Sequence, residues 1–324
     1  MSDFDIIKST DIGIANPTGR MIDGKKECLL NANLIKPIIL YSPSTLGNSI
    51  KYNGKNLISH INASLSTNSN PKVWYESGST GNPFGSSVTI YSICYGNGKY
   101  VAGGIDGKMA YSSDGINWTA ITDSTFESSY IQSICYGNGK FVAGGYKGKM
   151  AYSTDGVTWT KVANSTFGSF DIQSICYGNK KFVAGGGNSS GQIAYSTDGI
   201  TWTAVTDSTF RGSWIYSICY GNGEYVAGGI DGKMAYSSDG VTWTAVADST
   251  FSHDIQSICY GNGKFVAGGQ GGKIAYSTDG ITWTAVASST FGSSYIESIC
   301  YGNGKYVAVG GSGKMAYCQV GIPE

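Results

Sequence analysis

The hexapeptide Ser-Ile-Cys-Tyr-Gly-Asn occurs six times in this chain at nearly equal intervals of about 41 residues. Its cysteines are Cys94, Cys135, Cys176, Cys219, Cys259 and Cys300. A unit of this length, copied with so little drift, is typical of repeat architectures in which each unit buries its apolar face against a neighbour. The repeats therefore determine the architecture, and all other features have to be placed within them.

One repeat, residues 131–163, contains four short stretches with strand character. Residues 131–136 alternate in polarity and are followed by Asn138-Gly139, a strong signal for a tight hairpin. Residues 141–143, 149–153 and 159–162 supply three further strands. No window shows helical periodicity, so the chain is expected to be all-β. Four antiparallel strands in one repeat of this length predict the blade of a β-propeller.

The first and last repeats are incomplete in complementary ways. Before the first tract, residues 73–75 match only a fourth strand, and after the last tract the chain supplies three strands that end near residue 317. Joining the two ends hides open sheet edges. We therefore predict a six-bladed β-propeller of four-stranded blades at 72–324, with the last blade closed by an N-terminal strand. Residues 59–71 read as a linker, and residues 1–58 as an N-terminal docking or oligomerisation segment.

Composition excludes several classes of protein. The 324 residues have a formal net charge of zero and only 14% are charged, which argues against a nucleic-acid binder. No apolar run is long enough for membrane insertion, and the N-terminus does not resemble a signal peptide, which predicts synthesis in the cytoplasm. The repeated cysteines have equivalent neighbours rather than distinct mates, so they are predicted to be small buried thiols. No cofactor is predicted.

A Ser-x-Asp-Gly-x-x-Trp turn recurs between the third and fourth strands of five repeats. Its aspartates and tryptophans are Asp114, Asp155, Asp198, Asp239, Asp279, Trp118, Trp159, Trp202, Trp243 and Trp283. The motif resembles the Asp-box (BNR) repeat of sialidase-like propellers over roughly residues 72–320. We predict that the aspartates fasten their own turns, because five copies spread around a ring cannot form one catalytic or metal site.

The resemblance does not extend to sialidase chemistry. Those enzymes bind the substrate carboxylate with three arginines, whereas this chain has only Arg20 and Arg211. His253 beside Asp254 is interpreted as a surface polar pair rather than an acid/base dyad. We therefore predict no catalytic residue and no metal ligand.

The repeats differ from one another in two loops, which an up-and-down blade places at the same end of the propeller. One joins the second and third strands, and the other leads from the fourth strand into the next blade. The candidate ligand-binding residues in and beside these loops are Tyr91, Tyr130, Gln132, Tyr146, Phe170, Asp171, Gln173, Arg211, Trp214, Tyr216, His253, Asp254, Gln256, Tyr295 and Glu297. Aromatic rings beside polar side chains suit the faces and hydroxyls of sugars. Two simpler alternatives are open. The loops differ only through neutral drift, or the aromatic rings fold inward between blades and are not available to a ligand.

The leading hypothesis is a non-enzymatic propeller that recognises carbohydrate or another receptor on a cell surface. Its layout resembles that of receptor-binding proteins in bacteriophage tails or tail-like particles, which implies that residues 1–58 attach it to a larger assembly or a homo-oligomer. One alternative is a glycoside-cleaving enzyme that uses a carboxylate pair such as Asp254 and Glu297. Another is an intracellular scaffold for protein assembly.

Overall fold

The computed structural model describes residues 83–85, 88–187 and 191–319, together with the backbone of two strand pairs near the N-terminus. These pairs are the hairpins β1 (Met21–Ile22) with β2 (Lys25–Lys26) and β3 (Lys51–Tyr52) with β4 (Lys55–Asn56). The chain divides into two units, Met1–Glu76 and Ser77–Glu324. The predicted linker, the closing strand at 73–75 and all of the docking segment except these two strand pairs lie outside the described residues.

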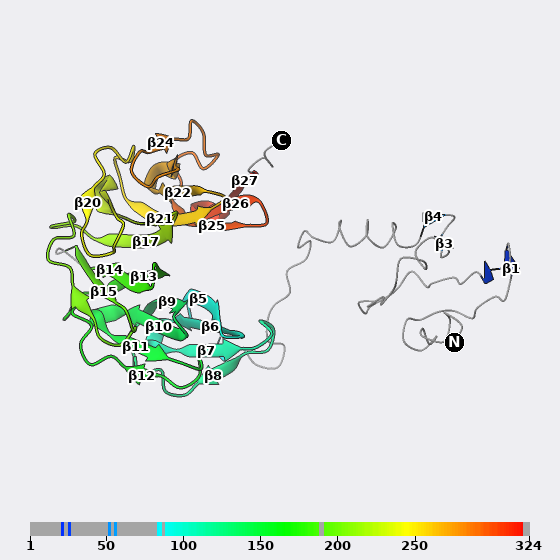
Figure 1. Cartoon of the computed structure of the whole chain (residues 1–324), viewed down its shortest axis with the longest axis horizontal. Coiled ribbons are helices and arrows are strands. Elements are labelled where there is room, and N and C mark those ends of the chain that lie inside the picture. Colours follow the sequence, from blue (N-terminus) through cyan, green and yellow to red (C-terminus); the bar gives the residue numbers. More distant parts are fainter. Residues whose placement is uncertain are drawn as a thin grey trace. The chain divides into compact units, whose positions relative to one another are not determined.

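Six antiparallel sheets follow one another along the second unit and confirm the predicted all-β propeller of six blades (Figure 1). The first three blades are β5 (Ile90–Gly96), β6 (Lys99–Gly104), β7 (Met109–Ser112), β8 (Thr119–Ile121); β9 (Ile131–Gly137), β10 (Lys140–Gly145), β11 (Met150–Ser153), β12 (Thr160–Lys161); and β13 (Ile172–Gly178), β14 (Lys181–Gly186), β15 (Gln192–Ser196), β16 (Thr203–Ala204). The last three are β17 (Ile215–Gly221), β18 (Glu224–Gly229), β19 (Met234–Ser237), β20 (Thr244–Ala245); β21 (Ile255–Gly261), β22 (Lys264–Gly269), β23 (Ile274–Ser277), β24 (Thr284–Ala285); and β25 (Ile296–Gly302), β26 (Lys305–Gly310), β27 (Met315–Gln319). Five blades have four strands, and the sixth has three among the described residues.

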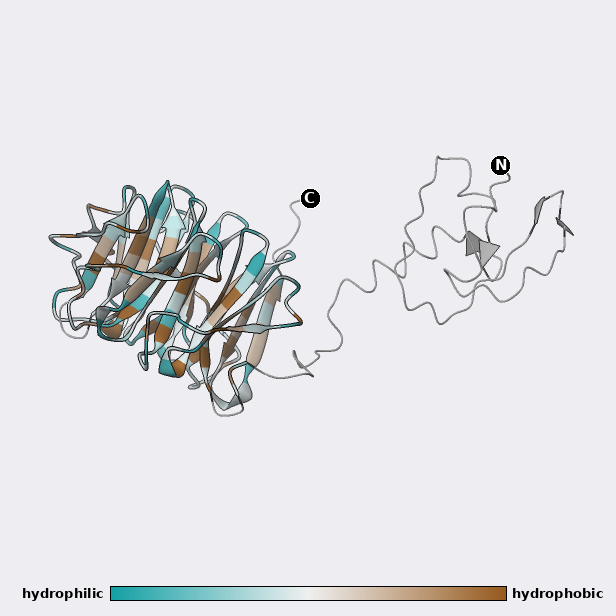
Figure 2. Ribbon diagram, turned by 90° about the horizontal axis from the view of Figure 1, so that it is seen from below, coloured by the Kyte–Doolittle hydropathy of each residue, from teal (hydrophilic) through white to brown (hydrophobic). Residues whose placement is uncertain are grey.

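Within each blade the strands are paired in sequence order, from an innermost first strand to an outer edge. The predicted tight hairpin joins the first two strands: Asn138 and Gly139 both have positive φ, 46° and 73°, as such a turn requires. A three-residue turn joins the second strand to the third, for example Tyr146–Gly148 in the second blade. Loops therefore gather at two opposite ends of the blades, and apolar residues run along the strands between them (Figure 2).

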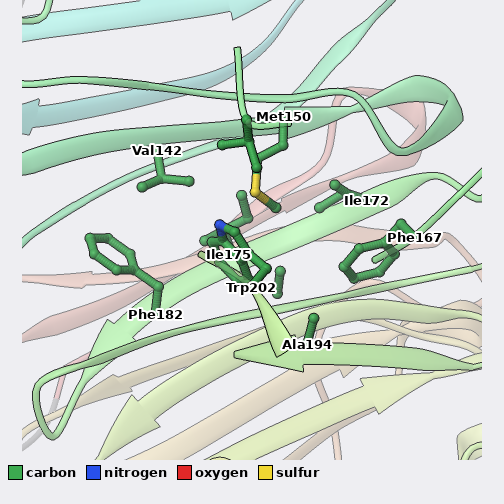
Figure 3. Close-up of a cluster of buried hydrophobic side chains, with 10 residues drawn as sticks. Val142, Met150, Phe167, Ile172, Ile175, Phe182, Ala194 and Trp202 are labelled. Atoms are coloured by element: carbon green, nitrogen blue, oxygen red, sulfur yellow. The ribbon is translucent and has the colours of Figure 1, made fainter. Parts of the chain in front are cut away.

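The hydrophobic core lies between blades rather than within one. One cluster combines Val142 and Met150 of the second blade with Ile172, Ile175 and Phe182 of the third, all at most 6% exposed (Figure 3). Equivalent clusters fill the next junctions. Because each blade buries its faces only against its neighbours, stability accumulates junction by junction.

Two contacts are repeated at successive junctions between innermost strands. The Ser133 hydroxyl accepts a hydrogen bond from the backbone N–H of Ile175 at 3.0 Å, and Ser92 accepts one from Ile134 at 2.9 Å. A glycine at the end of the first strand lies against the tyrosine ring of the next blade, as Gly137 does against Tyr177. A methyl group at Gly137 would overlap that ring. Successive blades are thus held together by the same serine hydrogen bond and the same glycine–tyrosine contact.

The strand predicted to close the ring, residues 73–75, lies outside the described residues, and within those residues the first and sixth blades do not pack on each other. Figure 1 shows the six blades as an arc, and the faces at its two ends have no partner there. On the first blade Ile93 is 60% exposed, whereas its counterpart Ile134 is 6% exposed. On the sixth blade Met315 is 72% exposed, and a methyl group at Gly302 would meet nothing within 4 Å.

The sixth blade has a larger residue at one position that is glycine in the other blades. Gly103 pairs with Ser92 in the first blade, and Val309 occupies the same register opposite Ser298. A Cβ atom at Gly103 would lie 2.7 Å from the Ile131 side chain of the next blade, closer than packing allows. A valine at this position would therefore need the neighbouring side chains to shift before another blade could pack on the sixth as the other blades pack.

The cysteines of the described residues are free thiols, as predicted. Cys94 to Cys259 are only partly accessible, and burial raises the pKa of the Cys219 thiol to about 12. Cys300 is exposed, which corrects the prediction that all six are buried. Cys300 lies on the side of the sixth blade that is not covered by another blade among the described residues.

Candidate functional site: the variable face

The two variable loops lie together in every blade, joined by a backbone hydrogen bond. In the second blade the N–H of Tyr146 donates to the carbonyl of Tyr130 at 2.9 Å. The same bond joins Ile230 to Trp214 at 3.0 Å. The four other bonds are Ile105 N–H to Thr89 O, Gly187 N–H to Asp171 O, Gln270 N–H to Asp254 O and Gly311 N–H to Tyr295 O. These loops form one end of the propeller, which we call the variable face.

The constant turns meet at the opposite end. The Asn138 amide donates to the carbonyl of Thr197 at 3.3 Å, which ties a hairpin of the second blade to the Asp turn of the third. Within a turn, Asp155 Oδ1 accepts hydrogen bonds from the N–H groups of Val157 and Thr158, both at 2.8 Å. This carboxylate therefore fastens its own turn, as predicted.

These hydrogen bonds change the acidity of the turn aspartates. Burial acts to raise the pKa of Asp155, but the N–H groups of Thr158 and Val157 and the hydroxyl of Ser153 outweigh it and lower the pKa to about 2. In Asp114 the lowering of the pKa comes first from the N–H of Asn117. The pKa values of Asp198, Asp239 and Asp279 are lowered in the same way.

Acid is expected to destabilise the propeller through these turns. A carboxyl group whose folded pKa is depressed contributes stability above its usual pKa of 3.8, and that contribution is lost as the pH falls towards the folded value, about 2 for Asp155. We expect the melting temperature to fall between pH 4 and pH 2, and Asp155→Asn to make the fall less steep while destabilising by about 1 kcal/mol at pH 7. Circular dichroism melts across this range measure both effects. A melting temperature that stays constant between pH 4 and pH 2 would contradict this role.

Sequence reasoning missed the residues that hold the variable face in place. In five repeats, a four-residue stretch ending in Ser-Thr-Phe comes just before the variable loop that leads from the fourth strand into the next blade, which we call the incoming loop. In the second repeat, Ser165 donates to the carbonyl of Gly148 at 2.6 Å, Thr166 has a φ of 70°, and Phe167 is 1% exposed. The left-handed conformation is unfavourable for a β-branched residue, and the flanking hydrogen bond and buried ring maintain it. The recurrence of this four-residue stretch was the feature of the sequence that could have identified these residues.

A lysine adds a second tie between the variable loops. Lys149 Nζ donates to the carbonyl of Phe126 at 3.0 Å and forms an ion pair with Glu127 at 2.9 Å. Lys108 and Lys314 bind the carbonyls of Phe84 and Phe291 in the same manner. The backbone of the variable face is thus fixed by a repeated framework, while its side chains vary.

None of the predicted ligand-binding residues is buried. Those that are exposed are Tyr91, Tyr130, Tyr146, Arg211, His253, Tyr295 and Glu297. Those that are partly exposed are Gln132, Phe170, Asp171, Gln173, Trp214, Tyr216, Asp254 and Gln256. The alternative in which the aromatic rings fold inward between blades does not hold for these side chains.

The structure brings several of these aromatic rings together. Tyr130 lies between Tyr91 and Tyr146, with ring centroids 6.1 and 5.8 Å away, and it is 41% exposed. The Lys147 ammonium lies 5.2 Å from the centroid of the Tyr146 ring. A second pair, Trp214 and Tyr216, has centroids 6.0 Å apart.

Two predicted carboxylates have a structural role between neighbouring blades. Asp171 accepts a hydrogen bond from the N–H of Lys147 at 2.9 Å, and Asp254 accepts one from the N–H of Asp231 at 3.1 Å. Burial, then the charges of Asp254 and Asp231, raise the pKa of the nearby Tyr216. These aspartates therefore help to shape the variable face.

The described part of the chain has neither a cluster of metal-ligating side chains nor a membrane-spanning helix. It contains no group of three or more His, Cys, Asp or Glu side chains placed to hold a metal ion. No helix within it is long and apolar enough to cross a membrane.

Comparison with solved structures places this fold among the β-propellers. The chain resembles YCF48 from Cyanidioschyzon merolae (TM-score 0.56, 20% identity, 71% of this chain and 82% of that chain). It also resembles YCF48 bound to D1 peptide (TM-score 0.58, 14% identity, 72% and 78%) and the computationally designed Ika8 protein (TM-score 0.56, 13% identity, 71% of each). At these identities the likeness is one of fold. No protein-family model matches the chain, and no curated protein matches it.

Proposed function

We propose that this protein is a non-enzymatic recognition propeller that binds carbohydrate on a cell surface through its variable face. The observation that carries the proposal is the row of half-exposed rings of Tyr91, Tyr130 and Tyr146 on a hydrogen-bonded loop framework. Aromatic faces pack against the apolar faces of sugar rings, and the nearby polar groups bind hydroxyls. A rigid framework lowers the entropic cost of binding.

The wider setting is part of the same proposal. The Ser-x-Asp-Gly-x-x-Trp turns support affiliation with Asp-box propellers that lack the sialidase active site. Residues 1–58 would attach the propeller to a virion or tail-like particle, or to further copies of the chain. Several modest sites on one particle would then bind a cell surface tightly through multivalency.

A polypeptide ligand is the second candidate, and one comparison favours it. The YCF48 structure with a TM-score of 0.58 is a complex with D1 peptide. The same exposed tyrosines suit a peptide, because tyrosine supplies a large contact area at low conformational cost.

A glycan array probed with the full chain tests the first candidate. We expect binding to a defined glycan, and about tenfold weaker binding after Tyr130→Ala, which removes the central ring of the row. Tyr317→Ala is the matched control, since this exposed tyrosine lies on the open face of the sixth blade. Absence of glycan binding by the folded chain would overturn the proposal, and binding on a peptide array would then favour the second candidate.

A further inference from the structure

The third blade departs from the other repeats at two positions whose side chains line the same hollow. Gln192 occupies the place of the lysine found at Lys108, Lys149 and the equivalent residues of the other blades. Arg211 is the only arginine after Arg20.

Gln192 and Arg211 both line a hollow of about 210 Å³ on the described surface. Phe170, from the loop that enters the third blade, lines it together with Gln192 and the segment 205–208. Arg211, from the loop that leaves the blade, completes the lining. The volume lies below the roughly 300–1,000 Å³ of pockets for drug-sized ligands, so one small ring suits it better than an extended ligand.

Hydrogen-bond donors and acceptors, including one positive and one negative side chain, line this hollow. Arg211 Nη2 donates to Asp207 Oδ2 at 3.0 Å, and the side chains of both residues are largely exposed. Asp207 Oδ1 accepts the N–H of Thr209 at 3.0 Å, which fixes the carboxylate. Gln192 Nε2 donates to the carbonyl of Thr166, which orients its amide. Donors and acceptors are thus set around the partly apolar wall formed by Phe170 and Val205.

We propose that this hollow is a monosaccharide subsite that takes a neutral hexopyranose ring. The Phe170 ring packs against the apolar face of the sugar, while Asp207 accepts hydroxyl hydrogens and Arg211 and Gln192 bind hydroxyl oxygens. An anionic sugar suits the site less well, because Asp207 already neutralises Arg211. This inference rests on the proposed carbohydrate-binding function and locates a site for it.

Variants that make the third blade resemble its neighbours test the inference with little risk to folding. Gln192→Lys introduces the lysine of the other blades, and Arg211→Gly introduces the residue found at the equivalent Gly168 and Gly292. Tyr317→Ala is again the control, since this exposed side chain lies on the open face of the sixth blade. Thermal melts of the full chain check that each variant is folded.

The measurement is saturation-transfer NMR titration of the full chain with methyl glycosides of glucose, galactose and mannose, alongside the glycan array. We expect at least one glycoside to bind, with an affinity about tenfold lower in Gln192→Lys and in Arg211→Gly and unchanged in Tyr317→Ala. If both blade-three variants bind as the unmodified chain does while Tyr130→Ala loses binding, this subsite is wrong and the proposed function stands. If the unmodified chain binds no glycan, both are wrong.

Discussion

Gly137→Ala is expected to destabilise the propeller by about 2–3 kcal/mol, whereas Gly302→Ala is expected to change the free energy of unfolding by less than about 0.5 kcal/mol. Both glycines end the first strand of a blade. The added methyl group at Gly137 would overlap the ring of Tyr177, so the junction would have to open. At Gly302 the methyl group would meet no neighbouring atom.

Urea unfolding followed by tryptophan fluorescence measures the two variants under the same conditions. The pair tests the open junction as well as the packing of a closed one. If the first blade packs on the sixth in solution as other blades pack on their neighbours, Tyr95 covers Gly302 and the two alanine variants lose similar stability. That result would contradict the open arc.

Phe167→Ala is expected to cost about 3–5 kcal/mol and to weaken ligand binding as well. The ring is 1% exposed in the core between the second and third blades (Figure 3). Its carbonyl accepts the N–H of Phe170 at 3.0 Å, so the same residue positions the loop that carries a proposed contact. Removing the ring therefore releases both a core contact and part of the variable face.

Phe251→Ala provides the comparison, because Phe251 occupies the same repeat position but is only partly buried. We expect it to lose less stability than Phe167→Ala in the same unfolding experiment. Equal losses would show that burial of this ring does not determine how strongly the incoming loop is held.

The features that the sequence predicted correctly depend on short stretches of chain. Alternating polarity and the Asn-Gly turns identify the strands, and the Ser-x-Asp-Gly turn closes on itself, as the bonds of Asp155 show. The variable face followed from up-and-down connectivity alone. These inferences hold because each depends on neighbours within one repeat.

The features that were missed depend on contacts across repeats. Val309 stands where the other repeats have glycine, and only the Ile131 side chain of a neighbouring blade, beside Gly103, shows how little room a side chain has at this position. Asp171 was assigned to a ligand, yet it also holds the N–H of Lys147 in another blade. The hollow in the third blade needs residues from three loops, which no local pattern reveals.

The pairing of each incoming loop with the turn of its own blade has a consequence for how the protein can diversify. The contact between Tyr130 and Tyr146 is contained in one short contiguous segment, and the serine and glycine joints on either side are nearly the same at each described junction. Such a segment can be exchanged between repeats as one unit. Recombination between homologous stretches of the gene would move the Tyr130–Tyr146 pair as a unit to another blade, where the repeated contacts between blades support it in the same way.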